Sequence, residues 1–165
     1  MFETGEYVIC GNNSVCLIKD ITTLNINGVD KKRKYYILKP VYSEGSTVYV
    51  PIDAVQASMR RVLSREKADE LVASIPEVPA LTIKDEKAAE SLYKECMQSN
   101  DCEEWVKLLK TLHSRKKKRL EKGNKVTAVD SKYTKLVEEN LCGELAIVFG
   151  ITKNEVKDFI AKKME

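Results

Sequence analysis

The sequence predicts an α+β protein, in which a small antiparallel β-barrel or curled sheet precedes an all-α bundle of about five helices. Two observations predict this class. Up to about residue 63, short runs rich in β-branched and aromatic residues alternate with turn residues. Beyond residue 63, longer segments begin with capping residues and show helical spacing of apolar residues. We therefore expect two domains, at residues 1–63 and 64–165.

Four apolar runs predict the strands of the first domain, at residues 7–10, 15–18, 35–38 and 47–50. Turn residues separate them, at Gly11-Asn12-Asn13, Asn27-Gly28 and Ser43-Glu44-Gly45. Asn-Gly favours a tight hairpin because both residues tolerate positive φ angles. Pro51 is expected to end the last run, because proline cannot donate a ladder hydrogen bond. Four or five such strands are typical of a small curled sheet or barrel.

Helical signals in the second domain predict five helices, at about residues 64–75, 85–98, 101–122, 127–150 and from 152 onward. The third helix is expected to begin at Asn100 or Asp101, whose side chains can accept hydrogen bonds from free amides. Thr127 with Asp130, and Thr152 with Glu155, resemble capping boxes. Glycines follow the third and fourth helices, as is common at helix ends.

Composition excludes several classes of function. Five cysteines, an odd number, favour free thiols in a reducing, cytoplasmic compartment, and we expect no signal peptide. The chain has no C-x-x-C spacing and a single histidine, His113, so we expect no metal and no cofactor. No stretch approaches the ~20 apolar residues that span a bilayer. Nucleotide-binding and nucleophile motifs are absent, so we expect neither an enzyme nor a small-molecule substrate.

Basic residues are concentrated in one segment. Residues 107–135 carry a net charge of +9, although the whole chain carries only +3. At about 100° per residue, Lys107, Lys118 and Lys122 lie opposite the apolar face of the third helix, with Lys110 and Arg115 beside them. Such a stripe can follow a phosphate backbone and release counterions. It can equally be a solvated face that keeps the protein soluble, and both interpretations stay open.

Aromatic residues allow two interpretations each. Trp105, the only tryptophan, could be a wedge beside DNA bases, but its spacing with Leu108, Leu109 and Leu112 favours core packing. The tyrosines at positions 35, 36, 42 and 49 could stack on single-stranded nucleic acid. Their strand positions make packing in the core or at the rim the more ordinary interpretation.

Several motifs, in order, resemble one family of bacterial transcription regulators. They are Phe2-x-x-Gly5-Glu6-Tyr7-Val8-Ile9, Tyr35-Tyr36-Ile37-Leu38, Val48-Tyr49-Val50-Pro51, Met59-Arg60-Arg61-Val62-Leu63 and Leu141-Cys142-Gly143-Glu144-Leu145-Ala146. The pattern is similar to the CarD/CdnL family and to the RNA-polymerase-interacting domain of the transcription-repair coupling factor. The helicase domains of the coupling factor have no counterpart here, so the stand-alone regulator is the closer match.

The resemblance implies a fold and two partners. The first domain would be a Tudor-like or SH3-like barrel that binds the β subunit of RNA polymerase, in a manner that resembles strand addition. The helical domain would contact promoter DNA through phosphates on the minor-groove side and stabilise the open complex. Such a regulator would be bacterial, cytoplasmic and nucleoid-associated.

The matching positions supply candidate site residues. Those expected to bind polymerase are Leu24, Asn25, Ile26, Thr47, Val48, Tyr49, Val50 and Pro51. Those expected to bind DNA are Lys84, Lys87, Lys107, Arg115, Lys118, Arg119, Lys122, Lys125 and Lys132. Well-known members carry a tryptophan wedge near the start of the second helix, whereas residues 83–87 here include no aromatic residue.

Two alternatives remain beside the polymerase-and-DNA interpretation. The protein could be an adaptor that binds polymerase or another protein and never touches DNA. Its barrel could instead bind RNA through the tyrosines, although residues 1–63 carry only +2 net charge.

Overall fold

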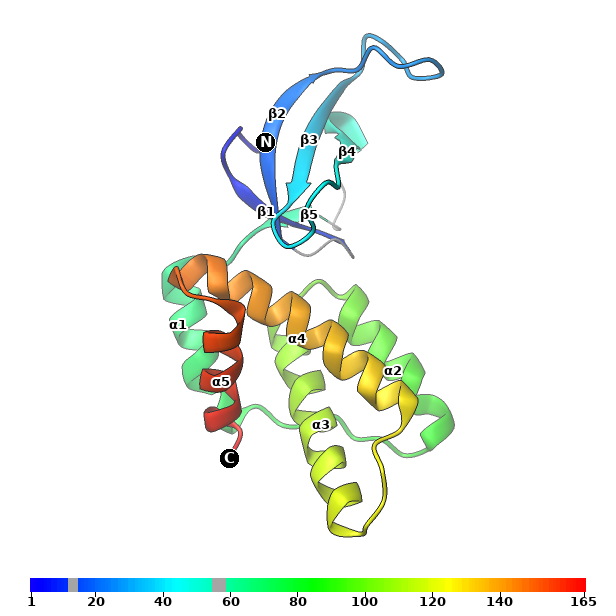
Figure 1. The fold of residues 1–165 in the computed structure, drawn as a ribbon, viewed down its shortest axis with the longest axis vertical. Coiled ribbons are helices and arrows are strands. Elements are labelled where there is room, and N and C mark those ends of the chain that lie inside the picture. Colours follow the sequence, from blue (N-terminus) through cyan, green and yellow to red (C-terminus); the bar gives the residue numbers. More distant parts are fainter. Residues whose placement is uncertain (12–14, 55–58) are drawn as a thin grey trace. The chain divides into compact units, whose positions relative to one another are not determined.

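A computed structural model describes residues 1–11, 15–54 and 59–165 of the chain. The chain forms two compact units, Met1–Val62 and Leu63–Glu165. The first unit is built from strands and the second from helices (Figure 1). This arrangement confirms the predicted α+β class. The function of each unit stays a prediction.

The first unit is a five-stranded antiparallel sheet with the strand order β4-β3-β2-β1-β5. The strands are β1 (Tyr7–Cys10), β2 (Val15–Thr23), β3 (Lys34–Pro40), β4 (Val48–Pro51) and β5 (Met59–Arg61), with the short helix η2 (Ile52–Ala54) after β4. Among the described residues the sheet is open, with β4 and β5 at its edges. Its curved form is compatible with the expected barrel (Figure 1).

Side chains that alternate along the strands build the core of this sheet. The core contains Val8, Cys10, Cys16, Ile18, Tyr36, Leu38 and Met59, and Val48 and Val50 pack against it. Alternation places these side chains on one face because successive strand residues point to opposite sides. The ring of Phe2 meets the ring of Tyr36 edge-on, at a centroid distance of 5.8 Å. The motif at the start of the chain therefore helps to close the core.

Two expectations about the sheet need correction. The segment Asn27-Gly28 forms no two-residue hairpin, because ten residues connect β2 with β3. Asn27 and Gly28 instead form a turn inside this loop. The amide of Val29 donates to the carbonyl of Ile26, and Gly28 has a φ of +87°. The strand β5, which pairs with β1, was not expected from the sequence. The turn predicted at residues 11–13 lies, apart from Gly11, outside the described residues.

The second unit contains the five predicted helices. They are α1 (Arg65–Ser74), α2 (Glu86–Gln98), α3 (Cys102–Glu121), α4 (Ala128–Phe149) and α5 (Lys153–Lys163), with the short helix η3 (Ile75–Glu77) after α1. Asp101 is the N-cap of α3, preceded by Asn100 with a φ of +54°. Thr152 and Glu155 form a complete capping box, whereas at α4 only the hydroxyl of Thr127 caps.

Helix α4 is the centre of this unit and contacts each of the other four helices (Figure 1). Trp105 is only 1% exposed and lies in the core with Leu108, Leu109 and Leu112. Core packing of Trp105, rather than a DNA wedge, is therefore confirmed. Over the described residues, no helix is both long and apolar enough to cross a membrane.

Candidate functional site

Among the described residues, strand β4 has one edge that pairs with no other strand. In the part of the chain that the structure describes, its single neighbouring strand is β3, with Ile37 opposite Tyr49 and Tyr36 opposite Val50. Edge strands present unpaired amides and carbonyls that can pair with a strand of another chain. Side chains alternate along β4: Val48 and Val50 pack toward the core, whereas Tyr49 is 47% exposed. Tyr49 is thus the most accessible side chain of this edge strand.

The second predicted polymerase-binding segment, residues 24–26, follows β2 directly. In the sheet, Thr23 pairs with Lys34, and Tyr35 pairs with Pro51. The start of the residue 24–26 segment and the end of β4 therefore lie at the same end of the sheet, on either side of β3. Ile26 is 48% exposed. An ion pair of 2.9 Å between Arg33 and Asp53 joins the loop before β3 to η2 at this end.

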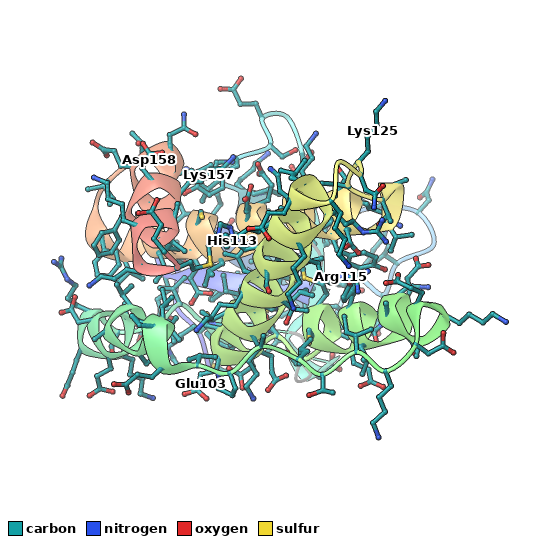
Figure 2. All side chains as sticks on the ribbon, turned by 90° about the horizontal axis from the view of Figure 1, so that it is seen from below. Glu103, His113, Arg115, Lys125, Lys157 and Asp158 are labelled. Carbon is teal, nitrogen blue, oxygen red and sulfur yellow. The ribbon has the colours of Figure 1, made fainter. Side chains whose placement is uncertain are left out.

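The predicted DNA-binding residues differ in what surrounds them. Arg115 is partly buried, and its Nε atom donates to Asp130 Oδ2 at 2.8 Å. Its Nη2 atom donates to both carboxylate oxygens of Glu86, at 2.8 and 2.9 Å. Burial alone would lower the pKa of Arg115, but the hydrogen bonds to Asp130 and Glu86 raise it. The side chain is therefore held between two carboxylates, on the side of α3 that faces α2 (Figure 2).

Two lysines of the predicted stripe are likewise engaged within the helical unit. Lys107 donates to Glu104 Oε1 at 3.0 Å, and this hydrogen bond together with the negative charge of Glu104 raises the pKa of Lys107. The Lys110 ammonium donates to the backbone carbonyls of Ile75, Pro76 and Val78, around η3. Arg115, Lys107 and Lys110, which helical spacing predicts to belong to one basic stripe, thus form contacts within the helical unit.

Other predicted DNA-binding side chains point into solvent. Lys84, Lys87, Lys118, Lys122, Lys125 and Lys132 are all exposed, and Arg119 is half-buried. Lys132 lies over the ring of Tyr133 at 5.4 Å. Lys118, Lys122 and Lys125 gather at the end of α3 and in the loop beyond it, and Figure 2 shows Lys125 projecting away from the helices. The stripe is therefore concentrated in the second half of α3.

A hollow of about 290 Å³ lies where the start of α2 meets the end of α3. We call it the basic hollow, and its lining residues are Glu86, Arg115, Lys118, Arg119, Lys122 and Asn124. Neither Glu86 nor Asn124 was expected from the sequence to belong to a site. An acidic residue in the first turn of a helix is ordinarily explained by the helix dipole, so the position of Glu86 in the sequence does not reveal its arginine partner.

The sequence of the first unit matches a known domain family. Residues 2–63 match the model of the CarD-like/TRCF RID domain family. The chain contains a CarD-like domain. The match covers all five strands and both predicted polymerase-binding segments, and it implies an interaction with RNA polymerase. A search of the curated proteins found no match to this chain.

Proposed function

We propose that this protein regulates transcription by docking its CarD-like domain on the β subunit of RNA polymerase and by contacting promoter DNA with its helical unit. The observation that carries the proposal is the match of residues 2–63 to the CarD-like/TRCF RID domain, whose sheet in this chain ends in the half-paired strand β4. In this proposal, contact with both partners changes the stability of the open promoter complex.

The docking surface is the outer edge of β4 together with residues 24–26. A strand of the polymerase would pair with the free backbone edge, and Tyr49 would supply a side-chain anchor. Tyrosine is enriched among residues that dominate binding energy, because its large ring loses little entropy on contact. Ile26, exposed at the same end of the sheet, is a second apolar anchor.

Binding to immobilised RNA polymerase β subunit tests this docking surface. We expect Tyr49→Ala to weaken binding by about tenfold or more, as removal of an interface anchor does. Tyr7→Ala is the matched control. Tyr7 is 38% exposed, but it belongs to β1, which β3 and β2 separate from β4. Val48 is a poorer probe, since its substitution also disturbs the core.

The two anchors also make a joint prediction for this assay. If Ile26 and Tyr49 both serve the interface, Ile26→Ala should also weaken binding, and the double variant should weaken it more than either single variant. Retention of Tyr49→Ala at the level of the wild-type chain would contradict docking at β4.

The proposed DNA contact rests on exposed lysines of the helical unit together with the half-buried Arg119. Lys118, Arg119 and the C-cap Lys122 lie near one another at the end of α3. Lys84 precedes α2, and Lys87 belongs to its first turn. Such side chains neutralise phosphates and supply affinity without base choice. Because Arg115, Lys107 and Lys110 have partners within the unit, the proposed contact depends chiefly on the end of α3.

Charge reversal tests this second half of the proposal. Lys118→Glu with Lys122→Glu should shorten the lifetime of the polymerase–promoter complex. It should also reduce the slope of log affinity against log salt by about 2, close to one unit for each phosphate that is no longer neutralised. The matched control reverses Lys94 and Lys162, which are exposed on α2 and α5 and lie outside the basic hollow. Equal effects of both pairs would contradict a localised DNA contact.

The second candidate function is an adaptor that binds polymerase without touching DNA. The internal pairing of Arg115, Lys107 and Lys110 favours it, because in the absence of DNA these three basic side chains already have partners within the unit. Footprinting of the promoter complex with and without the protein separates the two functions. New protection of DNA by the protein supports the DNA contact, and an unchanged footprint supports the adaptor.

A further inference from the structure

The basic hollow contains a preorganised arginine. Asp130, whose side chain is 3% exposed, accepts a hydrogen bond from Arg115 Nε at 2.8 Å. The same carboxylate accepts from the hydroxyl of Tyr93 at 2.8 Å. Arg115 is thus fixed at its Nε atom, while its Nη2 atom donates to Glu86, whose side chain is largely exposed. An arginine oriented in this way loses little side-chain entropy when it binds an anion.

An anionic group already occupies the outward side of Arg115. The carboxylate of Glu86 accepts two hydrogen bonds from Arg115 Nη2, and one of its oxygens lies 4.0 Å from Arg119 Nη2. Arginine donates to the oxygens of carboxylate and phosphate groups alike. The carboxylate of Glu86 therefore imitates a phosphate group at this position.

Charge and exposure make Glu86 a replaceable occupant. Arg115, Arg119, Lys118 and Lys122 supply four positive charges to the lining, against the single carboxylate of Glu86. The side chain of Glu86 is 62% exposed, whereas that of Arg115 is 17% exposed. An exposed carboxylate gains little from its ion pair and returns to water at low cost. Arg115 keeps Asp130 as a partner when Glu86 leaves.

We propose that the basic hollow is a binding site for one backbone phosphate of duplex DNA, and that Glu86 occupies this site in the free protein. Binding of DNA then exchanges the Glu86 carboxylate for a phosphodiester on Arg115 and Arg119, with Lys118 and Lys122 beside it. Glu86 acts as an internal competitor that lowers the affinity for DNA. This inference rests on the proposed DNA contact of the helical unit, and it names the site of one phosphate and the residue that opposes its binding.

Titration of the full chain into a short labelled duplex tests the proposal, with Glu86→Gln compared with Glu95→Gln. Both variants remove one negative charge from an exposed position of α2, but Glu95 lies near the other end of the helix and outside the hollow. We expect Glu86→Gln to bind about twofold to fivefold more tightly than the wild-type chain, the size of one exposed ion pair. Glu95→Gln should change affinity much less. The advantage of Glu86→Gln should shrink as salt screens the hollow.

A double-mutant comparison places the effect in the hollow. With Lys118→Gln and Lys122→Gln in the background, Glu86→Gln should increase affinity less, because two partners of the phosphate are already absent. Equal affinity of Glu86→Gln and Glu95→Gln, while the lysine variants weaken binding, overturns the Glu86 exchange and leaves the DNA contact standing. Absence of binding by the wild-type chain and by Glu86→Gln overturns both.

Discussion

At the scale of single residues, Asp130 holds together three helices of the second unit. It is a nearly buried carboxylate on α4 that binds Arg115 of α3 and Tyr93 of α2. Burial, together with the hydrogen bond to Asp130, raises the pKa of Tyr93. The phenol therefore remains a donor under ordinary conditions. A buried carboxylate with these two partners is well satisfied, whereas removal of its charge leaves a partly buried arginine less well paired.

Substitution of Asp130 provides a test at this scale. Asp130→Asn should lower the free energy of unfolding by about 2 kcal/mol, less than for a fully buried pair because Arg115 keeps Glu86. Urea denaturation measures the change. Glu86→Gln is the control and should cost less than about 1 kcal/mol, since that ion pair is exposed. Equal destabilisation by the two variants would show that Asp130 has no special role in stability.

Residue-level prediction from sequence succeeded where position in an element decides the environment. The apolar spacing of Trp105, Leu108 and Leu109 predicted a buried face, and the structure confirms it. Arg115 shows the opposite case. It belongs to a run of five basic residues, yet its carboxylate partners lie 29 and 15 positions away in the sequence. No local pattern reveals partners that meet only when α2, α3 and α4 pack together.

At the scale of elements, capping residues determine where the helices of the second unit begin. Ser64, Asp85, Asp101, Thr127 and Thr152 each accept a hydrogen bond from an amide in the first turn. These contacts are local in sequence, so their residue types predict them well. At α5 the contact is reciprocal, because the amide of Thr152 also donates to Glu155 at 2.8 Å. At α4 the Asp130 carboxylate binds Arg115 and Tyr93 instead of the amide of Thr127. This explains why the capping box predicted for Thr127 and Asp130 is incomplete.

The cap of α5 provides the test at this scale. Thr152→Ala should lower the free energy of unfolding by about 1 kcal/mol, because an amide of the first turn loses its acceptor. Thermal or urea unfolding measures the decrease. Thr152→Ser keeps the hydroxyl and should retain nearly all of the stability. An equal decrease in the serine variant would assign the effect to the methyl group instead of the cap.

Strand boundaries were harder to predict than helix caps. β5 contains only Met59, Arg60 and Arg61, and its strand character comes from pairing with Val8, Ile9 and Cys10 of β1. Three residues carry too little periodicity to indicate a strand, and two arginines weaken the signal further. The ten-residue loop after β2 was not predicted because Asn27-Gly28 indicates a turn, but does not indicate how far that turn lies from paired strands.

At the scale of the whole molecule, charge separates the two proposed contacts. Residues 1–63 carry +2 and residues 107–135 carry +9, so the remainder of the chain is net acidic. A sheet domain with little net charge suits pairing with a protein strand, and a strongly basic helix end suits phosphates. The proposed division of labour between the units follows from this distribution and from the family match of residues 2–63.

The sequence by itself determined the α+β fold class, the five helices with their caps and four of the five described strands. It also showed the family resemblance that the match of residues 2–63 supports. These properties follow from local spacing, residue type and motif order. The tertiary structure decided that β4, which contains Tyr49, lies at an edge of the sheet. It also decided which cations are exposed and that Glu86 pairs with Arg115. Such features depend on contacts between residues distant in the sequence, because partners and solvent exposure are defined only once the elements pack.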